Sequence, residues 1–271
     1  MSGLLPPVNG PKLSPFRGDI ENAEFLEVLS DESNQDTDHI LHSRVFQVRI
    51  DRKLYSLKVF SFFSVDYLRP WVPGGEDMIP DDIVRYQLDP FYSECRAFGK
   101  LVEMKKDDAL AIRCHGYTFL SEAIEDQIEE KFGFDDWNRQ PEDEGAPLRA
   151  IIKDYIRSKT VCGRKTLSKM RSNLEKLNDM GIFNMDIKED NYRGGRLFDF
   201  SIALTSPHVW LWDDLRSRDQ IFRDCRADLV AFDWMAQSIE KQRELQRARW
   251  SKGALRPRPG DKHFAGISKR Q

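Results

Sequence analysis

Several features that would place a chain outside the ordinary globular classes are missing from these 271 residues. No apolar run approaches the roughly 20 residues that a membrane span needs, and the first residues lack the charged-then-apolar order of a secretory signal. The cysteines form no C-x-x-C pair, and no histidine is spaced to complete a zinc site with Cys95, Cys114, Cys162 or Cys225. We therefore expect an intracellular protein, in the nucleus or cytoplasm, with reduced thiols and no membrane partner.

Charge is unevenly distributed along the chain. Residues 241–271 contain ten Lys or Arg and two acidic residues, so they carry about +8 and the remainder about −11 of the net −3. A basic segment that contains Pro and Gly is usually a solvated end. A sharper interpretation is nuclear import or weak, nonspecific contact with nucleic acid. We expect a flexible basic tail over 241–271.

The pattern of apolar residues predicts a sheet-rich first half and a helical second half. Prolines among small polar residues indicate a disordered leader over 1–22. An acidic stretch without clear periodicity, 122–145, is expected to be a surface insertion. The runs that read as strands are 23–29, 44–50, 54–62, 109–120 and 147–156. An amphipathic helix is expected over 165–180, with Gly181 as its C-terminal stop.

A lysine and a glutamate stand where the apolar pattern predicts burial. In the third strand Lys58 alternates with Ser56 and Phe60 on one face. Asp89-Pro90 supplies an N-cap and a first-turn proline for the helix that follows, which places Glu94 on the same stripe as its phenylalanines. A buried charge requires a partner of opposite sign, so we expect Lys58 to pair with Glu94. The alternatives are an edge-strand lysine that reaches solvent and an exposed helix glutamate.

The stretch from Gly181 to Ser201 carries the groups that phosphoryl transfer from a nucleotide requires. Asp186, Lys188 and Asn191 follow the order D-x-K-x-x-N. A Gly-Gly turn at 194–195 predicts a hairpin that returns Asp199 to the same end as Asn191, so both could face one metal ion. Alternatively, such Asp and Asn residues only cap and tie a loop.

These motifs resemble the catalytic and metal-binding loops of the protein-kinase fold. The resemblance implies an α+β, two-lobed protein-kinase-like fold with a reduced C-terminal lobe: an N-lobe over 23–156 and a C-lobe over 157–240. It implies ATP and Mg²⁺ as cofactors. The implied site residues are Asp186 and Lys188 for catalysis, Asn191 and Asp199 for the metal, and Lys58 with Glu94 for ATP. The backbone of Lys153, Asp154 and Tyr155 would contact adenine, with Ile152 near the rear of the pocket.

Other parts of the chain fit this resemblance less closely. The first loop, 30–39, has four acidic residues and no glycine, which disfavours a triphosphate and indicates a pseudokinase. The usual His-Arg-Asp reads Asn184-Met185-Asp186, and Ser201 stands where a glycine is usual. Asp228 matches the residue that braces the catalytic loop, or it is an ordinary acid near a helix start.

The motifs IKEDN and GGRLFDFS, with the HGY and IIKDY runs and no peptide-docking segment, also resemble a particular fungal kinase-like family. That family is named after the second Fta subunit of the kinetochore Sim4 complex. The function we expect is an ATP- and Mg²⁺-dependent phosphotransferase that transfers the γ-phosphate of ATP to a hydroxyl group of its substrate. The alternatives are a pseudokinase scaffold and a kinetochore or chromatin adaptor without catalysis. The implied partners are a nucleotide and the subunits of a protein complex.

Overall fold

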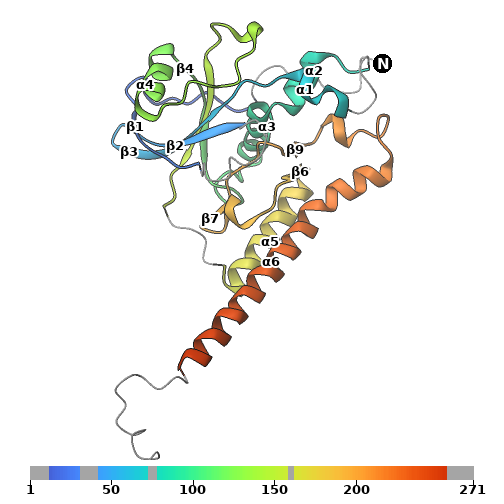
Figure 1. Ribbon diagram of the computed structural model, residues 1–271. Coiled ribbons are helices and arrows are strands. Elements are labelled where there is room, and N and C mark those ends of the chain that lie inside the picture. Colours follow the sequence, from blue (N-terminus) through green and yellow to red (C-terminus); the bar gives the residue numbers. More distant parts are fainter. Residues whose placement is uncertain (1–11, 31–41, 73–77, 158–161, 255–271) are drawn as a thin grey trace, which may run out of the picture.

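The computed structural model describes residues 12–30, 42–72, 78–157 and 162–254, with backbone alone for 249–254. The chain is a mixed α/β protein built on a five-stranded antiparallel sheet of order β1-β2-β3-β5-β4, in agreement with the predicted α+β class (Figure 1). The strands are β1 (Glu24–Val28), β2 (Ser43–Ile50), β3 (Lys53–Phe60), β4 (Cys114–Leu120) and β5 (Leu148–Asp154). Each strand lies inside its predicted run, or extends beyond the boundary of that run by one residue at most.

Alternation along β3 and β5 divides the core into two parts. Leu57 and Ile152 belong to the apolar cluster on one face of the sheet, whereas Phe60 and Ile151 belong to the cluster on the other. The β3–β5 register pairs Lys58 with Ile151 and Ser56 with Lys153. Because paired residues share a face, both lysines point to the same side as Phe60.

Helix α3 (Pro90–Glu103) covers that side of the sheet. The predicted cap is confirmed: the Asp89 side chain accepts a hydrogen bond from the backbone N–H of Phe91 at 2.9 Å, and Pro90 opens the first turn. Asp89 is fully buried and forms an ion pair with Arg149 of β5. The start of α3 is thereby attached to the central part of the sheet.

The stretch 122–145 is part of the core, so the prediction of an irregular surface insertion is wrong. It forms α4 (Glu122–Phe132) and a 3-10 turn, η2 (Pro141–Asp143). Ile124, Ile128 and Trp137 are buried against the second face of the sheet. They supply the apolar cover that β2 and β3 require on that face.

The leader prediction is also wrong in part. Residues 12–22 lie against the sheet: Leu13 is buried, and Phe16 donates its backbone N–H to the Tyr117 carbonyl at 2.7 Å. Residues 1–11 lie outside the described part of the chain.

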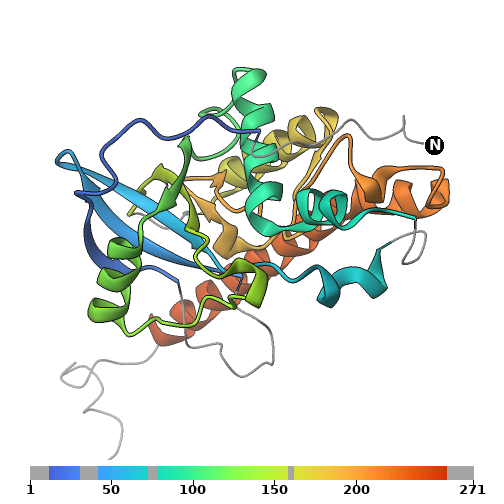
Figure 2. The same ribbon diagram turned by 90° about the horizontal axis from the view of Figure 1, so that it is seen from above.

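Between β3 and α3 the chain forms a small unit with its own core. Its elements are α1 (Val65–Leu68), η1 (Arg69–Trp71) and α2 (Asp81–Leu88). Val65, Val72, Ile79 and Val84 pack there with Val209 from later in the chain. Both views place this unit, in teal, beside the orange segment around 205–217 (Figures 1 and 2).

The second half contains helix α5 (Arg164–Asp179), the predicted Gly-Gly hairpin and a final long helix. The hairpin consists of β7 (Tyr192–Arg193) and β8 (Arg196–Leu197), with Gly194 and Gly195 at φ of 56° and 75°. The remaining short elements are β6 (Ile182–Phe183), η3 (Glu189–Asn191), β9 (Leu204–Thr205) and η4 (Val209–Leu211).

Helix α6 (Arg218–Ala254) packs along α5 and continues past its end (Figure 1). An ion pair between Arg171 and Asp233 links the two helices. The prediction of a flexible tail is wrong for 241–254, which continue α6, and 255–271 lie outside the described residues. Among the described residues, no helix is both long and apolar enough to cross a membrane.

Candidate functional site

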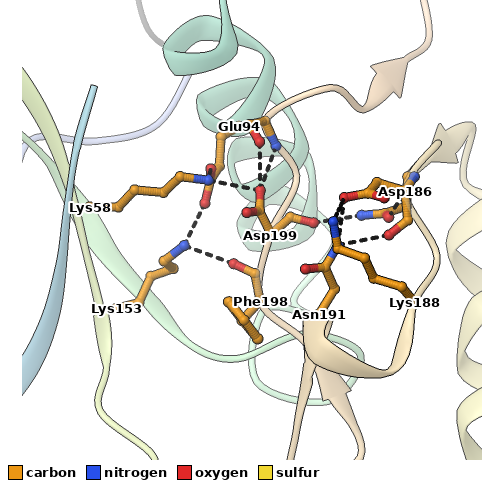
Figure 3. Close-up of polar contacts among 10 residues, drawn as sticks. Lys58, Glu94, Lys153, Asp186, Lys188, Asn191, Phe198 and Asp199 are labelled. Carbon is orange, nitrogen blue, oxygen red and sulfur yellow. Dashed lines mark hydrogen bonds and ion pairs between the residues drawn. The ribbon is translucent and has the colours of Figure 1, made fainter. Parts of the chain in front are cut away.

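Lys58, Glu94 and Asp199 meet in the core, as the sequence predicted for the first two (Figure 3). The Lys58 ammonium donates to Glu94 Oε2 and to Asp199 Oδ1, both at 2.8 Å. The side chains of Lys58 and Glu94 are 2% and 0% exposed, whereas that of Asp199 is 28% exposed. The alternatives of a solvent-reaching lysine and an exposed glutamate are therefore excluded.

Lys153 is a fourth member of this cluster through its side chain. The sequence analysis expected only its backbone to take part in the site, by contact with adenine. Its ammonium donates to Glu94 Oε1 at 2.6 Å and to the Phe198 carbonyl at 2.7 Å (Figure 3). Each oxygen of Glu94 thus has its own lysine. We call Lys58, Lys153, Glu94 and Asp199 the ion cluster; with all four ionised, its charges sum to zero.

The ion cluster changes the protonation behaviour of its members. Burial by itself would lower the pKa of Lys58, but Asp199 and then Glu94 raise it above its ordinary value. Burial by itself would raise the pKa of Asp199, but Lys58 and Lys153 bring it well below the ordinary range. Both groups are therefore charged at neutral pH.

Ser201 holds the Asp199 carboxylate from the other side. Its backbone N–H and its hydroxyl donate to Asp199 Oδ1 at 3.0 and 2.7 Å. With Lys58, this single oxygen accepts three hydrogen bonds. The departure from glycine at 201 therefore adds a hydroxyl donor to the site.

The predicted catalytic residues lie together on the loop before the hairpin. Lys188 Nζ lies 2.7 Å from Asp186 Oδ2, and Asn191 Nδ2 donates to the same oxygen at 2.9 Å and to the Asp186 carbonyl at 2.8 Å. The carboxylate of Asp186 is 41% exposed and the Lys188 side chain 56% exposed. Both therefore face solvent.

This loop is joined to the ion cluster and braced from below. The Asn184 side chain donates to the Asp199 carbonyl at 2.6 Å. The Asp228 carboxylate accepts the backbone N–H groups of Asn184 and Met185 at 2.6 and 2.8 Å. Asp228 is 1% exposed. Burial raises its pKa, and these two hydrogen bonds partly offset that rise. The bracing interpretation of Asp228 fits this geometry, and the helix-start alternative does not.

Other residues expected around adenine lie as follows. Asp154 accepts from His115 Nε2 at 2.7 Å and from Lys53 at 3.4 Å, and Tyr155 follows the end of β5. Contact of their backbone with adenine stays a prediction. Ile152 does not lie at the rear of this site, because it packs on the opposite face of the sheet.

The donor set is suited in kind to Mg²⁺, which prefers carboxylate and amide oxygens. Asn191 directs its amide nitrogen at Asp186, so its carbonyl oxygen faces elsewhere. Oδ1 of Asp199 already accepts from Lys58 and Ser201, so a cation would approach this partly exposed carboxylate at its other oxygen. Among the described residues, no group of three or more His, Cys, Asp or Glu side chains forms a metal site on its own.

A sequence signal for Lys153 exists but is weak. In a strand, residues two positions apart share a face, so the sequence predicts that Lys153 lies on the same face of β5 as Ile151. Only the register with β3 shows that Lys58 lies on this face too.

Taken together, the fold and site define a mixed α/β protein with a buried lysine–carboxylate cluster beside a half-exposed loop that carries Asp186. The chain belongs to the family described as kinetochore Sim4 complex subunit FTA2, whose sequence model matches residues 2–204. The match contains every residue of the ion cluster and ends before α6. No curated protein matches the chain.

Proposed function

We propose that this chain is a non-catalytic subunit of a kinetochore protein complex, located in the nucleus and built on a protein-kinase-like, two-lobed core. Membership of the FTA2 family supports the kinetochore assignment. The order Lys58, Glu94, Asp186, Asn191, Asp199 and their convergence support the kinase-like core.

The observation that carries the non-catalytic assignment is the second lysine in the ion cluster. Two buried lysines balance two carboxylates without any ligand, and each oxygen of Glu94 already has a partner. A nucleotide phosphate that approached Lys58 would compete with the Asp199 carboxylate for the ammonium, which already forms a charge-assisted hydrogen bond there. The cluster therefore connects the sheet, α3 and the segment that begins at Phe198 through the protein's own charges.

A second candidate function is an ATP- and Mg²⁺-dependent phosphotransferase. The observation that favours it is the placement of Asp186 and Lys188, which are half exposed next to Asn191 and open to an attacking hydroxyl. In that case Lys58 would hold ATP phosphates, and Asn191 and Asp199 would hold the metal.

Thermal unfolding with and without Mg-ATP distinguishes the two candidates. A ligand that binds only the folded state stabilises it by about 2.7 kcal/mol at a hundredfold excess over Kd. We expect no shift in the wild type. A magnesium-dependent rise in Tm that disappears in both Asp199→Asn and Lys58→Met would contradict the proposal and support the phosphotransferase.

A complementation experiment tests the kinetochore role directly. Asp186→Asn removes the carboxylate that phosphoryl transfer needs, at a half-exposed position. We expect the tagged variant to reach centromeres and to replace the wild-type chain in cells. Loss of viability with normal protein levels and normal centromere localisation would show that chemistry at Asp186 is required.

A further inference from the structure

A cavity separate from the ion cluster lies between the α1–α2 unit, the start of α3 and the segment after Asp199. Its volume is about 460 Å³. Phe62, Tyr67 and Leu88 line it from one side, and Met185, Ile202 and Trp210 from the other. The α1–α2 unit and the segment around 205–217, which both contribute lining residues, lie side by side in both views (Figures 1 and 2). None of the four ion-cluster residues lines it.

The polar groups in the wall are already hydrogen-bonded to one another. The Gln87 carbonyl accepts from Ser93 Oγ at 3.2 Å and from His208 Nε2 at 3.0 Å, and Gln87 Oε1 accepts from the Val209 N–H at 3.3 Å. Burial lowers the pKa of His208 to about 3, with a further contribution from Arg96, so the ring is neutral. The cavity therefore suits a mainly apolar group. One polar atom of a lining residue, Nε1 of Trp210, is buried and has no hydrogen-bond partner among the described residues.

Apolar side chains continue from the cavity onto the surface. Tyr67 and Ile202 line it and are also 59% and 46% exposed. In the same unit Trp71 and Met78 are 73% and 56% exposed. Exposed large apolar side chains in a unit that borders a cavity indicate a protein contact site. The volume accommodates one or two large side chains, which is the size of an anchor rather than of a whole helix.

The charge of the α1–α2 unit indicates what would flank that anchor. Both arginines in the described part of the unit already form ion pairs. Arg69 pairs with Asp81, and Arg85 lies 3.9 Å from Asp143. Asp66, next to Tyr67, forms no ion pair with any described residue. Asp66 therefore adds an unpaired negative charge to the surface of the unit, next in sequence to the cavity-lining Tyr67, and this charge favours a positively charged partner. The buried Arg96, which donates to the Gln87 carbonyl, lies behind the wall of the cavity and not on this surface.

We propose that this cavity is the docking site for a segment of another protein that inserts a large apolar side chain flanked by Lys or Arg. The inference rests on the proposed role as a complex subunit, since it names the kind of partner segment. The apolar anchor fills the cavity, and the basic residues face Asp66.

The test uses the full chain and a displayed library of random dodecapeptides, followed by fluorescence anisotropy with the selected peptides. We expect them to combine an aromatic or aliphatic anchor with Lys or Arg. Ile202→Arg should weaken binding at least about tenfold, because it removes apolar contact and adds like charge. Asp66→Lys should weaken binding less than Ile202→Arg does, and its effect should be larger at low salt than at high salt. The matched control is Val102→Arg at the end of α3, where the native side chain is 44% exposed; it should bind as the wild type does.

Selected peptides without an anchor or without basic residues would overturn the proposal, as would binding that Ile202→Arg leaves unchanged. A concentration-dependent dimer that dissociates in Ile202→Arg would also overturn it, since the occupant would then be a second copy of this chain. Unfolding curves of both arginine variants establish that they fold. The Mg-ATP experiment probes the ion cluster and not this cavity, so the two proposals can fail independently.

Discussion

Replacing Lys153 with Met tests whether the second lysine stabilises the core as a counter-ion. Met is one atom shorter than Lys and keeps an unbranched apolar side chain near the Phe98 and Phe198 rings, which the ammonium approaches at 5.7 and 5.8 Å. The change removes one of two cations from a fully buried Glu94 and the donor from the Phe198 carbonyl. Breaking a buried ion pair costs about 3–5 kcal/mol. Because Glu94 keeps Lys58, we expect about 3 kcal/mol, or a fall in Tm of roughly 6–12 °C at about 2–4 °C per kcal/mol.

A double-mutant cycle with Glu94→Gln makes this reasoning refutable. Each single variant leaves an unbalanced buried charge, whereas the double variant returns to the balanced pair of Lys58 and Asp199. We therefore expect the double variant to be at least about 1 kcal/mol more stable than the sum of the single effects predicts. Urea unfolding followed by tryptophan fluorescence gives the four free energies of unfolding, of the wild type, the two single variants and the double variant. Additivity within about 0.5 kcal/mol would refute the counter-ion argument. The control, Lys53→Met in a half-exposed pair with Asp154, should change stability by less than about 1 kcal/mol.

Three further predictions concern positions outside the ion cluster. Burial lowers the pKa of His208 from 6.5 to about 3. The folded protein therefore keeps its full stability from this residue above pH 6.5 and loses it as pH falls, by up to about 1.4 kcal/mol per pH unit. Unfolding measured between neutral pH and about pH 5 should show this slope, and His208→Gln should reduce it. Asp228→Asn weakens the support of two backbone N–H groups and should lower stability by about 1–3 kcal/mol, with faster amide hydrogen exchange at Asn184 and Met185; unchanged exchange would contradict the bracing role. Gly181→Ala should lower the melting temperature more than Gly133→Ala does. Both glycines have positive φ, 71° and 73°, so the backbone strain is similar, but only at 181 would the added Cβ lie within 3 Å of another atom, at 2.9 Å.

The elements that the sequence predicted are those whose signal is local. Alternation identified β2 and β3, the Asp89-Pro90 cap identified the start of α3, and the Gly-Gly pair identified the hairpin. The placement of Glu94 also followed from local spacing, since it shares a helical stripe with Phe91 and Phe98. In each case a few neighbouring residues determine the outcome.

The errors arise where the deciding contact is distant in sequence. Within 122–145 the buried residues of α4 are only Ile124 and Ile128, a pattern too sparse to outweigh many exposed acids. Leu13 is buried by elements that lie far along the chain. The role of Lys153 depends on the β3–β5 register and on Glu94, 59 residues away. Sequence periodicity carries no information about such pairings.

The two ion pairs between α3 and β5 restrict how that helix can move. Asp89 is tied to Arg149, and Glu94 is tied to Lys153, so two points on the helix are attached to two points on one strand. One attachment would leave the helix free to rotate about that point, whereas two separated attachments to one strand oppose both rotation against the sheet and sliding along it. A movement of α3 relative to β5 therefore requires that both ion pairs break together.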